Sequence, residues 1–313
     1  MTAELLIVTD ALIPAEDGYA MHPSLQGWQK PFHHCSRQWF HSPPKTPVEW
    51  YALLTGSDAA ALFIASLTDA SLKNHLIEDF QQCWLASPFH ARLGHDQLRV
   101  MPDALFPWHE EDAVWLCDLF NPLLAEEGMK LIHQHAALAL FSKEPLDANP
   151  APFATVSGNV LPNRHPQGRD AGRLMRLMSE IQMLLNQKPA KHRSVAGEPD
   201  VDGLWVWAGS KITQTVETPE RIPVATCNPC LRSLTAAKDA KIIISESDAI
   251  SELVQLDQPL PGQVILAGGD VAVCLKRSLL PGFGKSTWQP KRIKKEPELV
   301  ARLFAGSVGL GGK

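Results

Sequence analysis

The sequence lacks any long hydrophobic run. No apolar stretch in its 313 residues approaches the roughly 18 residues that a membrane-spanning helix needs. The N-terminal segment, MTAELLIVTD, also lacks the basic flank and the cleavage site of a secretory signal peptide. We therefore expect a cytoplasmic protein with no membrane partner.

An excess of positive charge is also missing. The chain has 29 Lys and Arg residues against 34 Asp and Glu residues, which gives a formal net charge of -5 at pH 7. A generic nucleic-acid-binding protein carries a basic surface that matches the phosphate backbone. We expect no nucleic-acid partner, and we interpret the short basic run at residues 291–295 as a solvated face.

Closed sets of metal ligands are absent as well. Cys227 and Cys230 form one CxxC pair, which suits redox chemistry or half of a zinc site, but no second pair accompanies it. A surface turn with two thiols is the alternative. The His33-His34 group with His41, and the pair His133 and His135, likewise do not close a site. We expect no metal and no cofactor.

Helical and strand patterns alternate along the chain. The clearest pattern spans residues 174–185, where apolar side chains fall on one helical face and Arg173, Arg176 and Glu180 lie on the other. The run at 204–207, LWVW, then predicts a central strand that is buried on both faces. Together the patterns predict an α/β fold with a mixed or mostly parallel sheet flanked by helices.

Weaker patterns complete this prediction. Helices are expected at residues 72–86 and 109–124, and residues 129–141 predict a strand pair or one long strand. The N-terminal run at 5–8 predicts a first strand, and strands are also expected at 241–245 and 264–267.

The pattern of predicted strands and helices changes after residue 210, which suggests two domains. We expect a main α/β domain at 1–214 and a smaller α/β subdomain at 215–313 with a frayed C-terminal tail. The main domain would carry a long loop at 14–47, rich in Pro, His and Trp. Because long irregular segments are often functional, the patch that includes Trp28, Trp39 and His41 is a candidate lid or ligand contact.

One block of the sequence resembles a known family. EIQMLL, the loop that contains Arg193 and Gly197, and the run LWVWAGS are similar to the bacterial RpfE-type regulatory proteins, often labelled cofactor-independent phosphoglycerate mutase. The run WLASPFH, followed by Asp96, extends the similarity upstream. The resemblance implies a degenerate alkaline-phosphatase-like core. It also shows departures, because Asp202 stands where the family has Asn and Ala208 where it favours Gly.

The resemblance also bears on catalysis. Phosphoryl transfer in the alkaline phosphatase superfamily needs two metal ions, a cluster of Asp and His ligands, and a Ser or Thr nucleophile. Asp10, at the end of the first strand, is the one weak catalytic candidate, and a turn residue is its alternative interpretation. The later Asp and His clusters of the superfamily have no counterpart after Gly209.

A ligand site is expected where arginines meet the end of the LWVW strand. Guanidinium groups match phosphate oxygens, and a strand that ends in small residues exposes its backbone N–H groups. The predicted ligand-binding residues are Arg169, Arg173, Arg193, Asp202, Gly209 and Ser210. The ligand would be a phosphorylated small metabolite, and the alternatives are a protein partner or surface ion pairs.

Three functions follow, in order of preference. The first is a regulatory or ligand-sensing, phosphoglycerate-mutase-like protein that does not turn over a substrate. The second is an active phosphoglycerate mutase or phosphatase-type phosphotransfer enzyme. The third is a protein–protein interaction module.

The run GFGKST at 282–287 resembles the end of a phosphate-binding loop but lacks its first glycine, so we interpret it as a turn.

Overall fold

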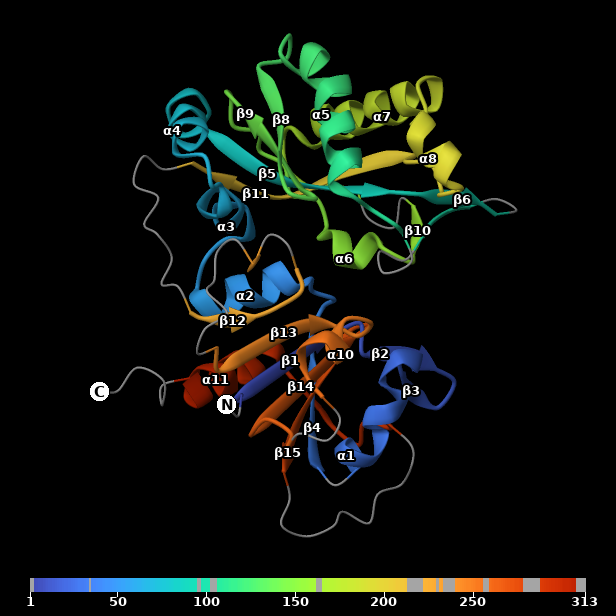
Figure 1. Cartoon of the computed structure of the whole chain (residues 1–313), viewed down its shortest axis with the longest axis vertical. Helices are drawn as coiled ribbons and strands as arrows, with labels where there is room; N and C mark the ends of the chain where they lie inside the picture. Colours follow the sequence, from blue (N-terminus) through green and yellow to red (C-terminus); the bar gives the residue numbers. More distant parts are fainter. Residues whose placement is uncertain are drawn as a thin grey trace. The chain divides into compact units, whose positions relative to one another are not determined.

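The chain forms two compact units (Figure 1). The computed structural model describes residues 3–33, 35–94, 97–101, 106–161, 165–212, 222–228, 231–232, 240–255, 259–277 and 288–307. The first unit joins Met1–Gly56 with Glu220–Lys313, and the second is the continuous segment Ser57–Pro219.

This division differs from the expected domains 1–214 and 215–313. The expected boundary lies close to an observed one, but the N-terminal 56 residues belong with the C-terminal part of the chain. The reason is strand pairing, because β1 (Leu5–Thr9) lies between β13 (Ile242–Glu246) and β14 (Gln263–Gly268) and runs parallel to both. Hydrophobic patterns identify strands but not their neighbours.

The first unit contains a seven-stranded sheet in the order β12-β13-β1-β14-β15-β4-β16. Its pairs are parallel except for β14–β15 and β15–β4, which are antiparallel, so the predicted mostly parallel α/β sheet is confirmed. The other strands of the unit are β12 (Val224–Ala225), β15 (Val271–Arg277), β4 (Cys35–His41), β16 (Ile293–Lys294) and the hairpin strands β2 (Leu12–Ala15) and β3 (Gly18–Met21).

Both faces of this sheet are covered. Side chains alternate along a strand, so Trp39 and Phe40 on β4 face opposite sides. The Trp39 side packs in one core with residues of η1 (Pro23–Trp28), α1 (Gln29–His33) and α10 (Ile250–Leu253). Two further helices, α2 (Pro47–Thr55) and α11 (Glu296–Ser307), contact β13 and β4 respectively.

The prediction of a long loop at 14–47 is wrong. This segment contains β3, η1, α1 and β4, and Trp28 and Trp39 are core residues with only 3% and 5% of their surface exposed. Prolines and histidines suggested a loop, yet His22 accepts a hydrogen bond as the N-cap of η1, and Pro23 begins that helix. The two tryptophans therefore build the unit and do not form a lid.

The second unit contains an antiparallel sheet in the order β11-β5-β9-β8, with a smaller sheet in the order β10-β7-β6. The strands are β5 (Gln82–Phe89), β6 (Ala91–Leu93), β7 (Leu98–Val100), β8 (Met129–Gln134), β9 (Ala137–Ser142), β10 (Val160–Leu161) and β11 (Gly203–Lys211). The helices are α3 (Ala59–Ser66), α4 (Ala70–Asp79), α5 (Glu110–Leu124), α6 (Phe153–Val156), α7 (Ala171–Gln187) and α8 (Lys191–Ala196).

Most expected elements of this unit are present. Helices α5 and α7 match their predictions, and β8 and β9 confirm the expected strand pair. The helix expected at 72–86 is wrong in its second half, because α4 ends at Asp79 and Trp84 lies in β5. No helix in the described part of the chain is long and apolar enough to cross a bilayer.

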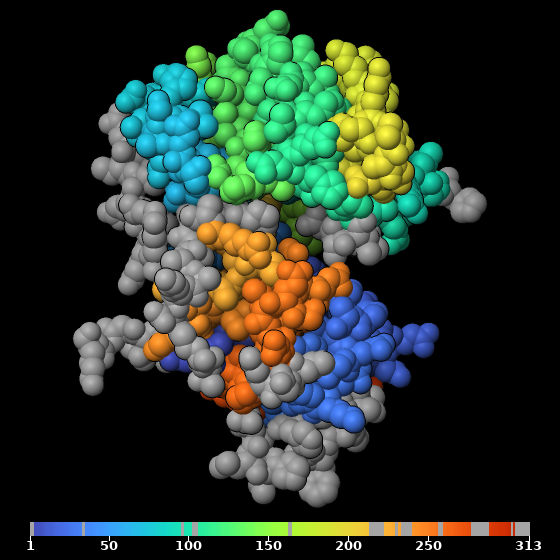
Figure 2. All heavy atoms as spheres, in the orientation of Figure 1, coloured from blue at the N-terminus to red at the C-terminus, as the bar shows by residue number. Residues whose placement is uncertain are grey.

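Strand β11 is buried but is not central. Its residues 203–207 are buried, although β11 is an edge strand whose one recorded neighbour in the sheet is β5. Helix α7 covers one face of this sheet, and α3 and α6 lie on the other (Figure 1). Side chains of α5, α7 and α8 form the outer surface above the sheet (Figure 2). Coverage by helices, not central placement, accounts for the apolar LWVW run.

The glycines that flank this run allow aromatic rings to pack on the strand. A Cβ atom at Gly203 would overlap the ring of Phe89, and one at Gly209 would overlap the ring of Trp84. The register of β11 on β5 shifts between Trp207 and Ser210, where Ala208 adopts a left-handed φ of 52°. The small residues at this strand end therefore serve packing and a bulge.

We expect Gly209→Ala to destabilise the second unit by about 1–3 kcal/mol, because the added methyl group must displace the buried Trp84 ring. Gly172→Ala is the matched control, since a Cβ there meets no atom within 4 Å and helix α7 favours alanine. Urea unfolding followed by circular dichroism measures both. Equal stability of Gly209→Ala and the wild type would show that packing of the Trp84 ring does not require glycine at position 209.

Candidate functional site

Arg193, expected in the ligand site, lies in the interior of the second unit. Helix α8 carries it, and its side chain is fully buried. Its Nε donates to the carbonyl of Pro199 at 2.8 Å, Nη1 donates to Asp112 at 2.7 Å, and Nη2 donates to the carbonyl of Pro107 at 2.8 Å. These bonds fix the segment after α8 against the start of α5. The guanidinium is a structural group and is not presented to a ligand.

Asp112 is the buried partner that makes this arrangement stable. It also accepts from His192 Nε2 at 2.7 Å and from the backbone N–H of His109 at 2.9 Å. Burial disfavours the charged carboxylate, but the bonds from His192, His109 and Arg193 outweigh it and hold the pKa of Asp112 below its usual value. A charged carboxylate thus faces a charged guanidinium in the interior.

Arg173 lies at the opposite end of α5. It pairs with Glu127 at 3.4 Å and with Glu144 at 3.6 Å, beyond the C-terminal end of α5. Asp112, which binds Arg193, instead lies in the first turn of α5. The 15 residues of α5 span roughly 20 Å at about 1.5 Å per residue. Arg169 is exposed and its backbone N–H donates to Asp147. The three arginines therefore do not converge.

The remaining predicted ligand residues, Asp202, Gly209 and Ser210, make contacts within the second unit. Asp202 accepts from the backbone N–H of Ala91 at 2.7 Å and contacts His90 Nδ1 at 2.7 Å. Ser210 donates to Asp58 at 2.9 Å, and Gly209 accommodates Trp84. The structure thus gives these three residues roles within the unit, and it does not assemble the expected anion site.

Other motifs are placed only in part. The Cys227 thiol contacts Glu252 at 3.4 Å, and its pKa is raised, mainly by burial; Cys230 lies outside the described residues. His133 Nδ1 contacts the carbonyl of His135 within the β8–β9 hairpin. His34 and the run at 282–287 also lie outside the described residues.

Asp10 lies at the carboxyl end of β1, the edge at which open α/β sheets commonly bind ligands. Its backbone has a left-handed φ of 54°, which is rare for a residue other than glycine. Although the residue is exposed, protein atoms around its carboxyl raise its pKa; His22 opposes this shift and Asp248 adds to it. This carboxyl end is the expected place for a catalytic residue.

The groups around Asp10 do not fit a metal centre within the described residues. Ser24 donates to Asp248 at 2.6 Å and also contacts His22, so these side chains tie η1 to the turn after β13. No cluster of three or more His, Cys, Asp or Glu side chains in the described part of the chain is arranged to hold a metal ion. We derive no metal-dependent step from this site.

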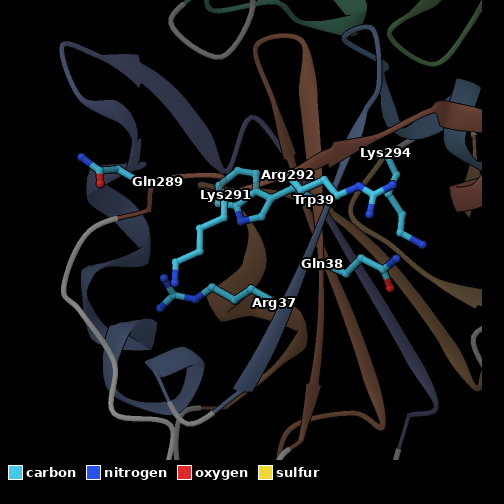
Figure 3. Close-up of a pocket in the computed structure, with 7 residues that line it drawn as sticks. All are labelled: Arg37, Gln38, Trp39, Gln289, Lys291, Arg292 and Lys294. Carbon is cyan, nitrogen blue, oxygen red and sulfur yellow. The ribbon is translucent and has the colours of Figure 1, made fainter.

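A different site lies at the β4–β16 edge of the large sheet (Figure 3). It is a cavity of about 370 Å³, within the range of about 300–1,000 Å³ that is usual for small-molecule sites. Among its described lining residues, four are cationic and none is a carboxylate. The lining residues are Arg37, Gln38, Trp39, Gln289, Lys291, Arg292 and Lys294.

The cavity follows from the shortness of β16. This strand pairs with β4 through two residues, Ile293 opposite Trp39 and Lys294 opposite Phe40. Arg37 and Gln38 precede this paired stretch on β4, and residues 289–292 precede it on the other side. The lining residues therefore come from the ends of two strands that meet only briefly.

Arg37 is held firmly in this cavity. Its guanidinium carbon lies 3.8 Å from the centre of the Trp288 ring, and β4 is paired along its whole length with β15. Partial burial lowers the pKa of Arg37, but an arginine keeps its charge in proteins. One cation of the cavity is thus positioned in advance of any ligand.

Sequence reasoning named Trp39 as a candidate lid or ligand contact but missed the rest of this site. The basic run at 291–295 was interpreted as a solvated face; Lys291 and Arg292 are indeed exposed, but with Lys294 they also line the cavity. The available signal was the alternation K-R-I-K, which suits a strand. The partners Arg37 and Trp39 lie about 250 positions earlier in the chain, so no local pattern connects them to this run.

Comparison with known proteins finds similarity in structure alone. No family model and no curated protein matches the sequence. A cofactor-independent phosphoglycerate mutase from Thermoplasma acidophilum aligns over 97% of this chain and 99% of its own, with 15% identity and a TM-score of 0.36. The PH0037 protein from Pyrococcus horikoshii aligns over 100% and 98%, with 11% identity and a TM-score of 0.41. These values are low, so they assign neither activity nor ligand.

We expect Asp112→Asn to lower the free energy of unfolding by about 1–3 kcal/mol at neutral pH, because the buried charge of Arg193 loses its nearer ionic partner and keeps Glu198, 3.5 Å from Nη1. The pKa of Asp112 is lowered in the folded protein, so its contribution is complete above the usual value of 3.8 and is lost as the pH falls through the lowered pKa. The difference between wild type and variant should therefore shrink in acid.

Urea unfolding between about pH 2 and pH 7 measures this difference. Glu180→Gln is the control, since its ion pair with Arg176 is exposed and its removal should change stability by less than about 0.5 kcal/mol. A gap between wild type and Asp112→Asn that stays constant with pH would contradict the ionic role of Asp112.

Proposed function

We propose that the protein binds a small phosphorylated metabolite in the β4–β16 cavity and acts as a regulatory or ligand-sensing protein. The observation that carries this proposal is the gathering of Arg37, Lys291, Arg292 and Lys294 around one cavity with no carboxylate among its described lining residues. This departs from the overall balance of the chain, whose formal net charge is -5.

The electrostatics favour an anion. Like charges that line one cavity repel one another, and an anion bound between them removes that repulsion and adds attraction. Arginine provides planar pairs of N–H donors that match phosphate oxygens, while lysine adds a mobile point charge. The amides of Gln38 and Gln289 add neutral donors for the uncharged part of a metabolite.

A second candidate function is phosphotransfer at Asp10. The left-handed backbone of Asp10 and its position at the carboxyl end of β1 favour this alternative. Turnover separates the two functions. Interconversion of phosphoglycerates with Mg²⁺ or Mn²⁺ that is abolished by Asp10→Ala would support the enzyme, whereas binding without turnover supports the sensor.

We expect phosphate esters to bind the full chain and the variant Lys291→Ala,Arg292→Ala to bind them at least about tenfold more weakly, because each charged contact contributes roughly 1 kcal/mol or more. Isothermal titration calorimetry with fructose 6-phosphate and fructose 1,6-bisphosphate at constant ionic strength measures this. Arg173→Ala is the control, since Arg173 belongs to the second unit and pairs with Glu127.

Two results would overturn the proposal. If neither ester binds, the cavity is not an anion site and a protein-docking role becomes the better explanation. If Arg173→Ala abolishes binding while the double variant does not, the ligand binds at the second unit, as the sequence suggested.

A further inference from the structure

We infer that the cavity takes a ligand with two anionic groups, one held on each side of the sheet edge. This inference rests on the proposed function and names its ligand class more closely. It follows from the way in which the four cationic side chains lie as two pairs on either side of β4.

Within the two strands, the division comes from the alternation of side chains. Arg37 shares the Trp39 face of β4, whereas Gln38 shares the Phe40 face. In the parallel pair, Ile293 lies opposite Trp39 and Lys294 lies opposite Phe40.

Lys291 lies in a bend and Arg292 lies outside β16, so the strand alternation does not reach them. Figure 3 places the Lys291 side chain on the Arg37 side of β4 and the Arg292 side chain on the side of Lys294 and Gln38. One pair is therefore Arg37 with Lys291, and the other is Arg292 with Lys294.

Figure 3 also shows how the side chains of each pair lie. The Lys291 side chain extends toward the Arg37 guanidinium on one side of β4. Arg292 extends to the other side, where Lys294 and Gln38 also lie. Two cationic side chains thus lie on each side of β4, and a single phosphate cannot contact both pairs.

Neighbouring carboxylates weaken the second pair without cancelling it. Lys294 Nζ lies 2.8 Å from Glu298, an exposed ion pair that a phosphate can replace at small cost. Glu296, the other acidic residue of the first turn of α11, is paired with Lys45. The second place therefore keeps the charge of Arg292, while the first has both Lys291 and Arg37, whose guanidinium lies over the Trp288 ring.

A ligand with two anionic ends gains from this geometry. Once one phosphate is bound, the second is held near the other pair of cations at high effective concentration, so its binding adds affinity with little further loss of translational freedom. A monophosphate engages one pair and leaves the repulsion within the other. Affinity should therefore rise steeply with the second phosphate.

The test compares two probes that differ by one phosphate, fructose 6-phosphate and fructose 1,6-bisphosphate, by calorimetry on the full chain. We expect one bisphosphate per chain, bound at least about thirtyfold more tightly than the monophosphate. Lys291→Ala and Arg292→Ala, each removing one side, should both reduce bisphosphate affinity to near that of the monophosphate. Lys241→Ala removes an exposed cation of the same unit that pairs with Glu4, and it should leave both affinities unchanged.

The outcomes separate this inference from the proposed function. Equal affinities for the two probes, or two monophosphates bound per chain with no gain for the bisphosphate, would overturn the two-ended site while leaving an anion-binding protein. Sensitivity of bisphosphate binding to one variant and not to the other would also overturn it. Failure of both probes to bind would end both proposals. Thermal melting of each variant shows that it is folded, which the exposure of Lys291 and Arg292 favours.

Discussion

The first unit depends on the pairing of β1 with strands from the other end of the chain. Leu6, Ile7 and Val8 are fully buried between β13 and β14, so the core of this unit requires residues 242–268 to be present. Strand β4 pairs with β15 in the same sheet, and β16 lies beside β4 at the edge. The cavity is therefore a product of long-range pairing, which brings residues 291–294 next to Arg37 on β4.

The sequence predicted those parts of the fold that local periodicity determines. Helix α7 follows from apolar residues at steps of three and four, and β1 follows from a short apolar run. Trp84 was misplaced because its spacing from Leu76 and Phe80 also suits a helix, although the chain turns into β5 between them. Burial of β11 was predicted correctly, but its edge position depends on which strands pair, and that is a tertiary property.

The candidate site was less predictable because the chemistry of an arginine depends on its surroundings. Arg193 satisfies its donors inside the protein, Arg173 forms surface ion pairs, and Arg37 lies on an aromatic ring at a cavity. Nothing in the local sequence of these residues distinguishes the three states. Asp112, the partner that buries Arg193, lies 81 positions away. Only the arrangement of elements shows which guanidinium can meet a ligand.

The shortness of the edge strands has a consequence for the behaviour of the protein in solution. Both edges of the large sheet, as far as the chain is described, are strands of two residues, β12 and β16. A long open edge invites a strand from another molecule and leads to aggregation, whereas a short edge with lysines resists it. At the β16 edge, the cations that line the cavity also protect the sheet from such pairing, so the proposed anion binding and resistance to aggregation would depend on the same side chains.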